Sequence, residues 1–302
     1  ACLIYIMNKS NLIDWFLILA IGATWGASFL FIKVAAPEVG PITLVAIRLL
    51  IASLLLIPIF IRLEHLRDFK NHLFPLLFLG IFNASVPFLL FSYSALSINA
   101  GTMSVLNGTS PLFAFIISII WLKLPFNWVQ LVGIFVGIIG LFIFIGFESL
   151  EFDIKPLLLC LLAAFLYAFC SNYIYRLKHL DSTYIACMTL LVGAVLFTPF
   201  AFFEKGVSSE LTTQVLWSIF LLGFLCTGLA YIGFVILLRR VGPVKASTVL
   251  FIVPLTGMFW AYLFLGETIT LTMILGCFLI LSGVGITNLT KQDEVLKTNL
   301  TN

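Results

Sequence analysis

Residues 79–91 read LGIFNASVPFLLF and open a segment that runs from Leu79 to Leu141. The same segment recurs 143 residues later, without a gap, as Leu222 to Val284. A proline inside the segment and two glycines after it match in register, and such matches rarely arise by chance because both residues disfavour helix interiors. The chain therefore consists of two related halves. The matched pairs include Leu79 and Leu222, Gly80 and Gly223, Phe91 and Phe234, Ser104 and Ser247, Pro111 and Pro254, Leu122 and Leu265, Gly133 and Gly276, and Gly140 and Gly283.

The composition excludes a soluble protein. Of 302 residues, 62% are hydrophobic and 10% are charged, and the mean hydropathy is +1.19. A membrane-spanning helix needs about 20 mostly apolar residues. We therefore expect an all-α integral membrane protein with ten transmembrane helices, five in each half. The expected spans are Leu12–Ile32, Ile42–Ile61, Leu73–Tyr93, Thr102–Leu122, Trp128–Phe147, Pro156–Tyr175, Tyr184–Phe203, Gln214–Leu238, Ala246–Phe264 and Leu271–Leu289.

An odd number of spans in each half predicts that the two repeats are inverted. The second repeat would enter the membrane upside down relative to the first, an arrangement that recurs in secondary transporters. We expect an N-terminal cytoplasmic segment at 1–11, repeats at 12–147 and 156–289, and a cytoplasmic tail at 290–302. Because Met7-Asn-Lys-Ser reads like a natural start, residues 1–6 are interpreted as upstream sequence.

The distribution of Lys and Arg predicts the orientation. Of these sixteen residues, twelve fall on the side of the N-terminus, and Arg48 lies within a span. The other three, Lys33, Lys155 and Lys205, fall on the opposite side. Since cytoplasmic loops carry an excess of Lys and Arg, both termini are expected in the cytoplasm of a multi-pass protein of the plasma or inner membrane. The net charge of +3 is thus a topology signal and gives no reason to expect nucleic-acid binding.

Several motifs carry a family resemblance. The first span contains Trp25-Gly-Ala-Ser-Phe29 followed by Lys33, and Arg48 lies in the second. Ser104-Val-Leu-Asn-Gly-Thr-Ser-Pro111 and its counterpart at 247–254 lie in the fourth and ninth, and Gly266-Glu267 follows the ninth. This pattern resembles the EamA-like branch of the drug/metabolite transporter superfamily. The resemblance implies two helical bundles around a central cavity and movement of small metabolites.

Arg48 is the most costly residue to place in the membrane, at about 2.5–3.5 kcal/mol at a helix centre. Two interpretations remain open. In one, the side chain snorkels outward or binds backbone carbonyls. In the other, it binds a carboxylate or phosphate of the substrate, which the lack of any mid-span carboxylate favours.

Polar and aromatic residues in the spans form a predicted substrate-binding cavity, with hydrogen bonding between helices and ordinary packing as the alternatives. At three positions one repeat has an asparagine where the other repeat has an apolar or thiol residue, which indicates that the asparagine is specialised. These are Asn83, Asn107 and Asn172. The full predicted set is Trp25, Ser28, Arg48, Asn83, Tyr93, Asn107, Tyr167, Asn172, Thr227 and Tyr231.

The mirrored Pro111 and Pro254 predict matched bends in the fourth and ninth spans, which act either as a gate or as static kinks. The glycines of the fifth and tenth spans, such as Gly133 and Gly283, predict close helix packing. That packing is expected within the chain, with a homodimer contact as the alternative.

No motif indicates an enzyme, a cofactor or a metal. No His lies in a span, no carboxylate pair is present, and no Gly-x-x-x-x-Gly-Lys-Ser/Thr motif occurs. Asp14 is the one acidic candidate near a span interior on the inner side, and Glu267 lies at the outer edge. Facilitated diffusion, exchange or potential-driven movement is therefore favoured over a buried proton relay. The sequence favours a secondary exporter of amino acids or related metabolites, with a small-molecule substrate and the lipid bilayer as partners. An exchanger of anionic sugar-phosphates, nucleotide-sugars or cofactor-like metabolites and a non-transporting scaffold are the alternatives.

Overall fold

The computed structural model describes residues 9–62, 72–123, 128–145, 154–177, 180–204, 208 and 210–300, and its regular elements are all helical. Eight helical stretches in this part are long and apolar enough to cross a membrane. Two further apolar helices, Val249–Leu265 and Leu271–Thr287, are shorter. The expected count of ten spans therefore stays a prediction. Residues 1–8 of the predicted N-terminal segment lie outside the described residues.

Two of the expected spans in the first half, and one in the second, are built from several consecutive helical elements. The first half contains α1 (Lys9–Val39), α2 (Pro41–Arg62), α3 (Leu73–Leu79), η2 (Gly80–Ser85), α4 (Val86–Ser94), α5 (Ala100–Asn107), α6 (Ser110–Leu122) and α7 (Trp128–Ile145). The second half contains α8 (Lys155–Arg176), α9 (Ser182–Ala201), α10 (Thr213–Leu221), η4 (Leu222–Leu229), α11 (Ala230–Ala246), α12 (Val249–Leu265) and α13 (Leu271–Leu300). We call the end of the bundle where α1 begins the inner side and the end where α1 finishes the outer side.

The first helix is longer than expected. It runs through Pro37 to Val39, so Lys33 lies inside α1 rather than in an outer loop as the charge count assumed. The ammonium group of Lys33 donates a hydrogen bond to the carbonyl of Ala95, at 2.7 Å. A long side chain near a helix end can place its charge at the interface in this way, which makes a helical lysine compatible with the membrane.

The mirrored prolines occupy different positions in their helices, and matched bends that act as a gate stay a prediction. Near Pro111 the helix is interrupted, with α5 ending at Asn107 and α6 beginning at Ser110. Pro254 lies inside the continuous helix α12. The residues before each proline explain the difference: Gly108-Thr109-Ser110 favour a break, since Gly and hydroxyl residues disfavour helix interiors, whereas Phe251-Ile-Val-Pro254 offer no such alternative.

A widened, π-helical segment occurs at the same place in both halves. The segment η2 spans Gly80–Ser85, and η4 spans Leu222–Leu229, which covers the positions 143 residues later. In each, a hydroxyl donates to the carbonyl five residues earlier: Ser85 to Gly80 at 2.9 Å and Thr227 to Leu222 at 2.8 Å. Segments of this kind occur frequently at functional sites.

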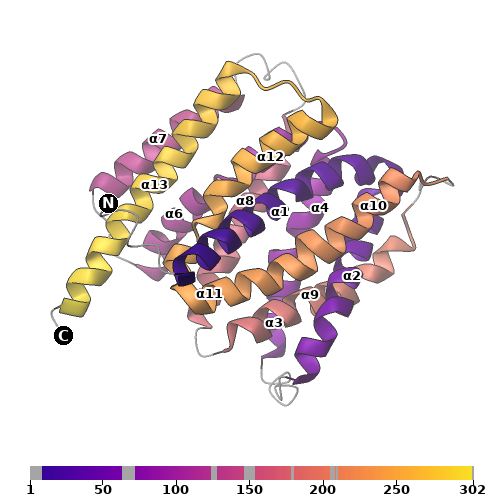
Figure 1. Cartoon of the computed structure of the whole chain (residues 1–302), viewed down its shortest axis with the longest axis horizontal. Coiled ribbons are helices and arrows are strands. Elements are labelled where there is room, and N and C mark those ends of the chain that lie inside the picture. Colours follow the sequence, from indigo (N-terminus) through magenta and orange to yellow (C-terminus); the bar gives the residue numbers. More distant parts are fainter. Residues whose placement is uncertain are drawn as a thin grey trace.

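The two halves pack through reciprocal contacts. Helix α2 packs against η4, and its counterpart α9 packs against η2. Likewise α1 packs against α12 and α8 against α6, while α7 and α13 lie side by side along one edge of the molecule (Figure 1). The centre of the molecule is therefore lined by elements of both halves.

Glycines allow α7 and α13 to touch backbone to backbone. A Cβ atom added at Gly283 would lie 2.5 Å from the carbonyl oxygen of Gly133 and 2.6 Å from the amide nitrogen of Gly137. One added at Gly140 would lie 2.7 Å from the amide nitrogen of Ile280. The predicted packing of these glycines within the chain is confirmed, and the homodimer contact stays a prediction.

Carboxylates of the second half cap two helices of the first half on the outer side. Glu267 accepts hydrogen bonds from the amides of Ala100 and Gly101, at 2.7 and 3.0 Å, where α5 begins. Glu204 accepts from the amides of Ile42 and Thr43, where α2 begins. Negative charge at a helix N-terminus is stabilising, so both carboxylates hold the halves together on the outer side.

Replacing Gly283 with Ala is expected to destabilise the protein by about 1–3 kcal/mol, because the added methyl group meets backbone that cannot move aside. The matched control is Gly285→Ala, where the nearest atom to the new Cβ, on Phe251, is 3.9 Å away. The thermal unfolding midpoint in detergent should fall for Gly283→Ala and stay unchanged or rise slightly for Gly285→Ala. Equal midpoints for the two variants would contradict the described packing.

Candidate substrate-binding site

Arg48 lies in the middle of the bundle, on α2, with 5% of its surface exposed. Its Nε donates a hydrogen bond to the hydroxyl of Thr227, at 2.7 Å. The plane of the guanidinium lies over the ring of Phe88, 3.6 Å from the ring centroid. One edge and one face of the guanidinium are thus held by two different elements, η4 and α4.

Thr227 can receive this hydrogen bond because its helix is widened. Its hydroxyl hydrogen is donated to the carbonyl of Leu222 within η4, so a lone pair of the oxygen faces Arg48. The side chain of Thr227 is fully buried. A buried hydroxyl with both a donor and an acceptor partner orients the arginine at little energetic cost.

Aromatic side chains surround the arginine. Arg48 interacts electrostatically with the hydroxyls of Tyr167 and Tyr231. The ring of Tyr231 meets Trp25 edge to face, with centroids 6.2 Å apart, and Tyr167 stacks on Phe91 at 6.4 Å. Four of the predicted site residues besides Arg48 therefore belong to one neighbourhood: Trp25, Tyr167, Thr227 and Tyr231.

The guanidinium keeps hydrogen-bonding capacity to spare. Neither of its terminal nitrogens donates a hydrogen bond to another residue that the structure describes. The two salt bridges in this part of the chain, Arg239 with Asp181 and Arg240 with Asp14, lie at the inner side and do not involve Arg48. Buried polar groups normally find partners, so the terminal nitrogens of Arg48 are the notable exception in this neighbourhood of the described residues.

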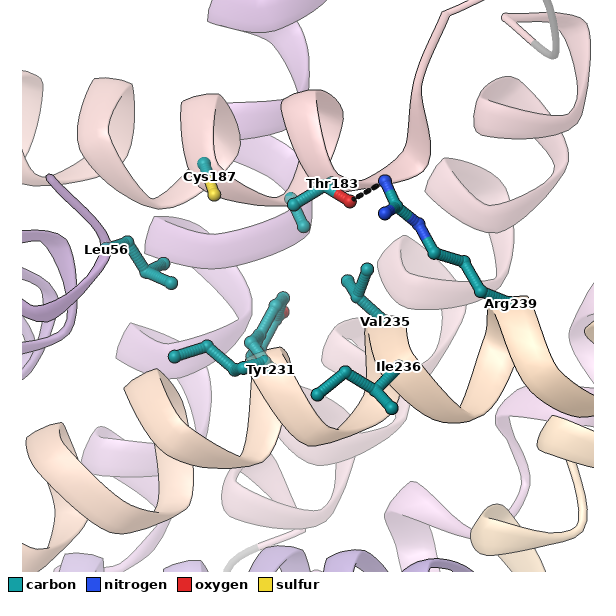
Figure 2. Close-up of a pocket in the computed structure, with 9 residues that line it drawn as sticks. Leu56, Thr183, Cys187, Tyr231, Val235, Ile236 and Arg239 are labelled. Carbon is teal, nitrogen blue, oxygen red and sulfur yellow. Dashed lines mark hydrogen bonds between the residues drawn. The ribbon is translucent and has the colours of Figure 1, made fainter. Parts of the chain in front are cut away.

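A cavity of about 200 Å³ runs between α2, α9 and α11 toward the inner side. Tyr231 belongs both to its wall and to the surroundings of Arg48. In Figure 2, Tyr231, Val235 and Ile236 of α11 face Thr183 and Cys187 of α9. The full lining is Leu56, Thr183, Ala186, Cys187, Tyr231, Ile232, Val235, Ile236 and Arg239.

The other predicted site residues lie elsewhere or have partners of their own. Ser28 donates to the carbonyl of Trp25 in its own helix, at 2.6 Å. Asn172 donates to carbonyls of Ala114 and Ala168, both at 3.0 Å, and so links α8 to α6 as the packing alternative expects.

Three predicted residues remain. Tyr93 is 41% exposed near the outer end of α4, and Asn83 is half-buried in η2. Asn107 ends α5, and its side-chain oxygen is buried without a hydrogen-bond partner among the described residues.

The acidic edge residues have structural partners. Asp14 accepts a hydrogen bond from Nε of Arg240, at 2.8 Å, and Glu267 caps α5. Neither lies beside Arg48 or lines the cavity. The described residues contain no group of three or more His, Cys, Asp or Glu side chains arranged for a metal ion.

Sequence reasoning missed two residues of this site. Phe88 gave no signal, since one more aromatic residue in an apolar span is unremarkable. Arg239 was used only to predict orientation, although it follows Tyr231 by eight residues and hence lies on the same face of a helix.

Comparison with known proteins identifies the family. The profile of the EamA-like transporter family matches the chain twice, at residues 13–146 and 154–289. The chain belongs to this family. It is therefore a multi-pass membrane protein of a transporter family, built from two EamA repeats.

Individual relatives agree with this assignment. The EamA-like chain is 31% identical to the uncharacterized transporter YoaV of Bacillus subtilis, over 88% of this chain and 94% of the relative. It is 25% identical to a probable amino-acid metabolite efflux pump of Salmonella typhimurium, over 90% and 94%. A solved crystal structure shares its fold with a TM-score of 0.65 at 14% identity, covering 94% of this chain and 98% of the other.

Replacing Thr227 with Val is expected to destabilise this EamA-like protein by about 1–3 kcal/mol, because it leaves Nε of Arg48 buried without an acceptor. Thr227→Ser keeps the hydroxyl and should retain most of the stability. The thermal unfolding midpoint in detergent distinguishes the two. A Val variant as stable as the Ser variant would show that the hydrogen bond to Arg48 contributes nothing.

Proposed function

We propose that the protein is a secondary carrier that exports small metabolites bearing a carboxylate, such as amino acids or related compounds. The observation that supports this most directly is the buried guanidinium of Arg48 with its terminal nitrogens unpaired among the described residues. An arginine binds a carboxylate through two parallel hydrogen bonds. The substrate would supply the counter-ion that the chain does not place beside Arg48.

The surroundings favour a solute that is partly apolar. Phe88, Trp25, Tyr167 and Tyr231 border the guanidinium, and the cavity wall beyond is mostly apolar. Sites for small molecules commonly combine an apolar wall with a few polar groups that set orientation. An amino acid or keto acid with an apolar side chain suits this lining.

The packing of the two halves supports transport by alternating access. We propose that ten helices span the membrane as two inverted repeats, with α12 and α13 completing the set. The reciprocal contacts of α2 with η4 and of α9 with η2 are those expected of repeats that enclose a shared site. The cavity on the inner side and the carboxylate caps on the outer side support an inward-facing state as our proposal for this structure.

The proposal of export, and of amino acids as substrates, is also supported by the name of a relative. The Salmonella typhimurium protein bears the name of a probable amino-acid metabolite efflux pump. We place the protein in the plasma or inner membrane with the inner side in the cytoplasm, as the Lys and Arg distribution predicts. Since Asp14 and Glu267 are engaged at the two ends of the bundle, we propose exchange or facilitated diffusion as the energetics.

An exchanger of sugar-phosphates or nucleotide-sugars is the second candidate. A phosphate dianion is best bound by several cations, and Arg48 is the one cationic side chain beside Thr227 and Phe88 in the described residues. A monocarboxylate therefore suits the site better.

The test is counterflow in proteoliposomes loaded with a mixture of amino acids, keto acids and sugar-phosphates, with efflux followed by mass spectrometry. Arg48→Ala is expected to slow efflux of carboxylates at least about tenfold, equivalent to about 1.4 kcal/mol of lost interaction. Its folded yield should fall less than its efflux, because the truncation removes packing against Phe88 from the folded protein but takes the whole counter-ion from the substrate. Arg48→Lys keeps the charge but loses the paired hydrogen bonds, so an intermediate rate is expected.

Two results would contradict the proposal. If Arg48→Ala reduced folded yield and efflux equally, Arg48 would be a structural residue. If the folded wild-type protein moved no solute, the scaffold alternative would replace the carrier.

A further inference from the structure

A second arginine stands at the inner mouth of the cavity. Arg239 follows Tyr231 on α11 by eight residues, which is about 12 Å along a helix, and both line the same wall. On α2, Leu56 lies eight residues after Arg48 and lines the cavity beside them. The cavity therefore runs from Arg239 at the inner end to Tyr231, which separates it from Arg48.

Arg239 is held loosely. One terminal nitrogen, Nη2, donates both to Oδ2 of Asp181, at 2.8 Å, and to the hydroxyl of Thr183 (Figure 2). Its Nε and Nη1 donate to no other described residue, and its side chain is 56% exposed. Exposed ion pairs contribute only about 0–1 kcal/mol to stability, so another carboxylate can replace Asp181 easily.

Asp181 keeps other partners when Arg239 leaves it. Its Oδ1 caps α9 by accepting from the amides of Thr183 and Tyr184, at 2.8 and 3.1 Å, whereas Oδ2 faces Arg239. Burial works to raise the pKa of Asp181. The pKa is nevertheless held below its usual range by these two hydrogen bonds, by a third from the Thr183 hydroxyl and by the charge of Arg239. The carboxylate is thus charged at neutral pH and remains satisfied by the helix N-terminus.

The neighbouring Arg240 makes a different contact. Its Nε pairs with Asp14 of α1, at 2.8 Å, and it does not line the cavity. Two adjacent arginines thus each have an acidic partner, but only Arg239 borders the open space.

We propose that Arg239 is a second anion-binding station, where the carboxylate of a monoanionic solute displaces Asp181 before it passes Tyr231 and reaches Arg48. This inference rests on the proposed function and adds to it the residue that first receives the substrate from the inner side. The solute moves from an exposed arginine to a buried one, where the lower dielectric strengthens the ionic bond.

The alternative role for Arg239 is purely structural, joining α11 to α9. The two roles predict different responses to a free carboxylate. If Arg239 is a binding station, it binds the free carboxylate and releases Asp181. If the ion pair is only structural, the free carboxylate does not change it.

The experiment uses benzoate as the carboxylate probe and phenylglyoxal as the arginine-modifying reagent, on the full chain in detergent. Each of two variants keeps only one of the adjacent arginines. Mass spectrometry follows the modification of Arg239 in the Arg240→Gln variant and of Arg240 in the Arg239→Gln variant. Benzoate is expected to slow modification of Arg239 at least about fivefold and to leave Arg240 unchanged. Asp181→Asn, which keeps the cap of α9 but removes the competing charge, is expected to lower the half-protecting benzoate concentration about tenfold.

The inference is overturned if benzoate protects both arginines equally from modification, or does not protect Arg239. It is also overturned if Arg239 becomes more reactive in Asp181→Asn but benzoate does not protect it. The arms with Asp181 intact decide the matter if Asp181→Asn does not fold.

Because binding is read without turnover, the outcome is separable from that of the proposed function. If counterflow depends on Arg48 but benzoate does not protect Arg239, only the inference about Arg239 is contradicted. Protection of Arg239 without any counterflow supports the station and removes the carrier.

Discussion

A guanidinium buried in an apolar bundle is the constraint on which the central part of this protein depends. Arg48 is stable there because Thr227 accepts from its Nε and Phe88 lies against its face. Thr227 can do so because the π-helical turn of η4 lets its hydroxyl donate to Leu222 at the same time. The local widening of a helix and the placing of a charge are therefore parts of one arrangement.

That arrangement requires both halves of the chain. Arg48 and Phe88 come from the first repeat, and Thr227 and Tyr231 from the second. The halves are held in register by backbone contact between the glycines of α7 and α13 and, on the outer side, by Glu204 and Glu267. The reciprocal packing of α2 with η4 and of α9 with η2 brings both widened turns to the interface between the repeats.

Much of the fold could be predicted, because hydropathy and helix-breaking residues act locally. The expected spans agree with the helices to within a few residues for most of the chain. The exceptions include α1, which extends seven residues past the expected end at Ile32, and α13, which extends eleven past Leu289. The error arose from treating Lys33 as a loop residue, although its ammonium group reaches the carbonyl of Ala95 from within the helix. The matched prolines also lie in different settings, since the residues before each of them decide whether the helix breaks.

The sequence by itself determined that the chain is helical and membrane-spanning, that it consists of two related halves, and that Arg48 needs a partner. These follow from composition, from spacing and from the cost of a charge in lipid, none of which requires knowledge of distant contacts. Only the tertiary structure decided that the partner is Thr227, 179 residues away, and that Arg239 rather than Arg240 borders the cavity. Adjacent residues on a helix point in different directions, and which of them meets open space depends on how the helices pack.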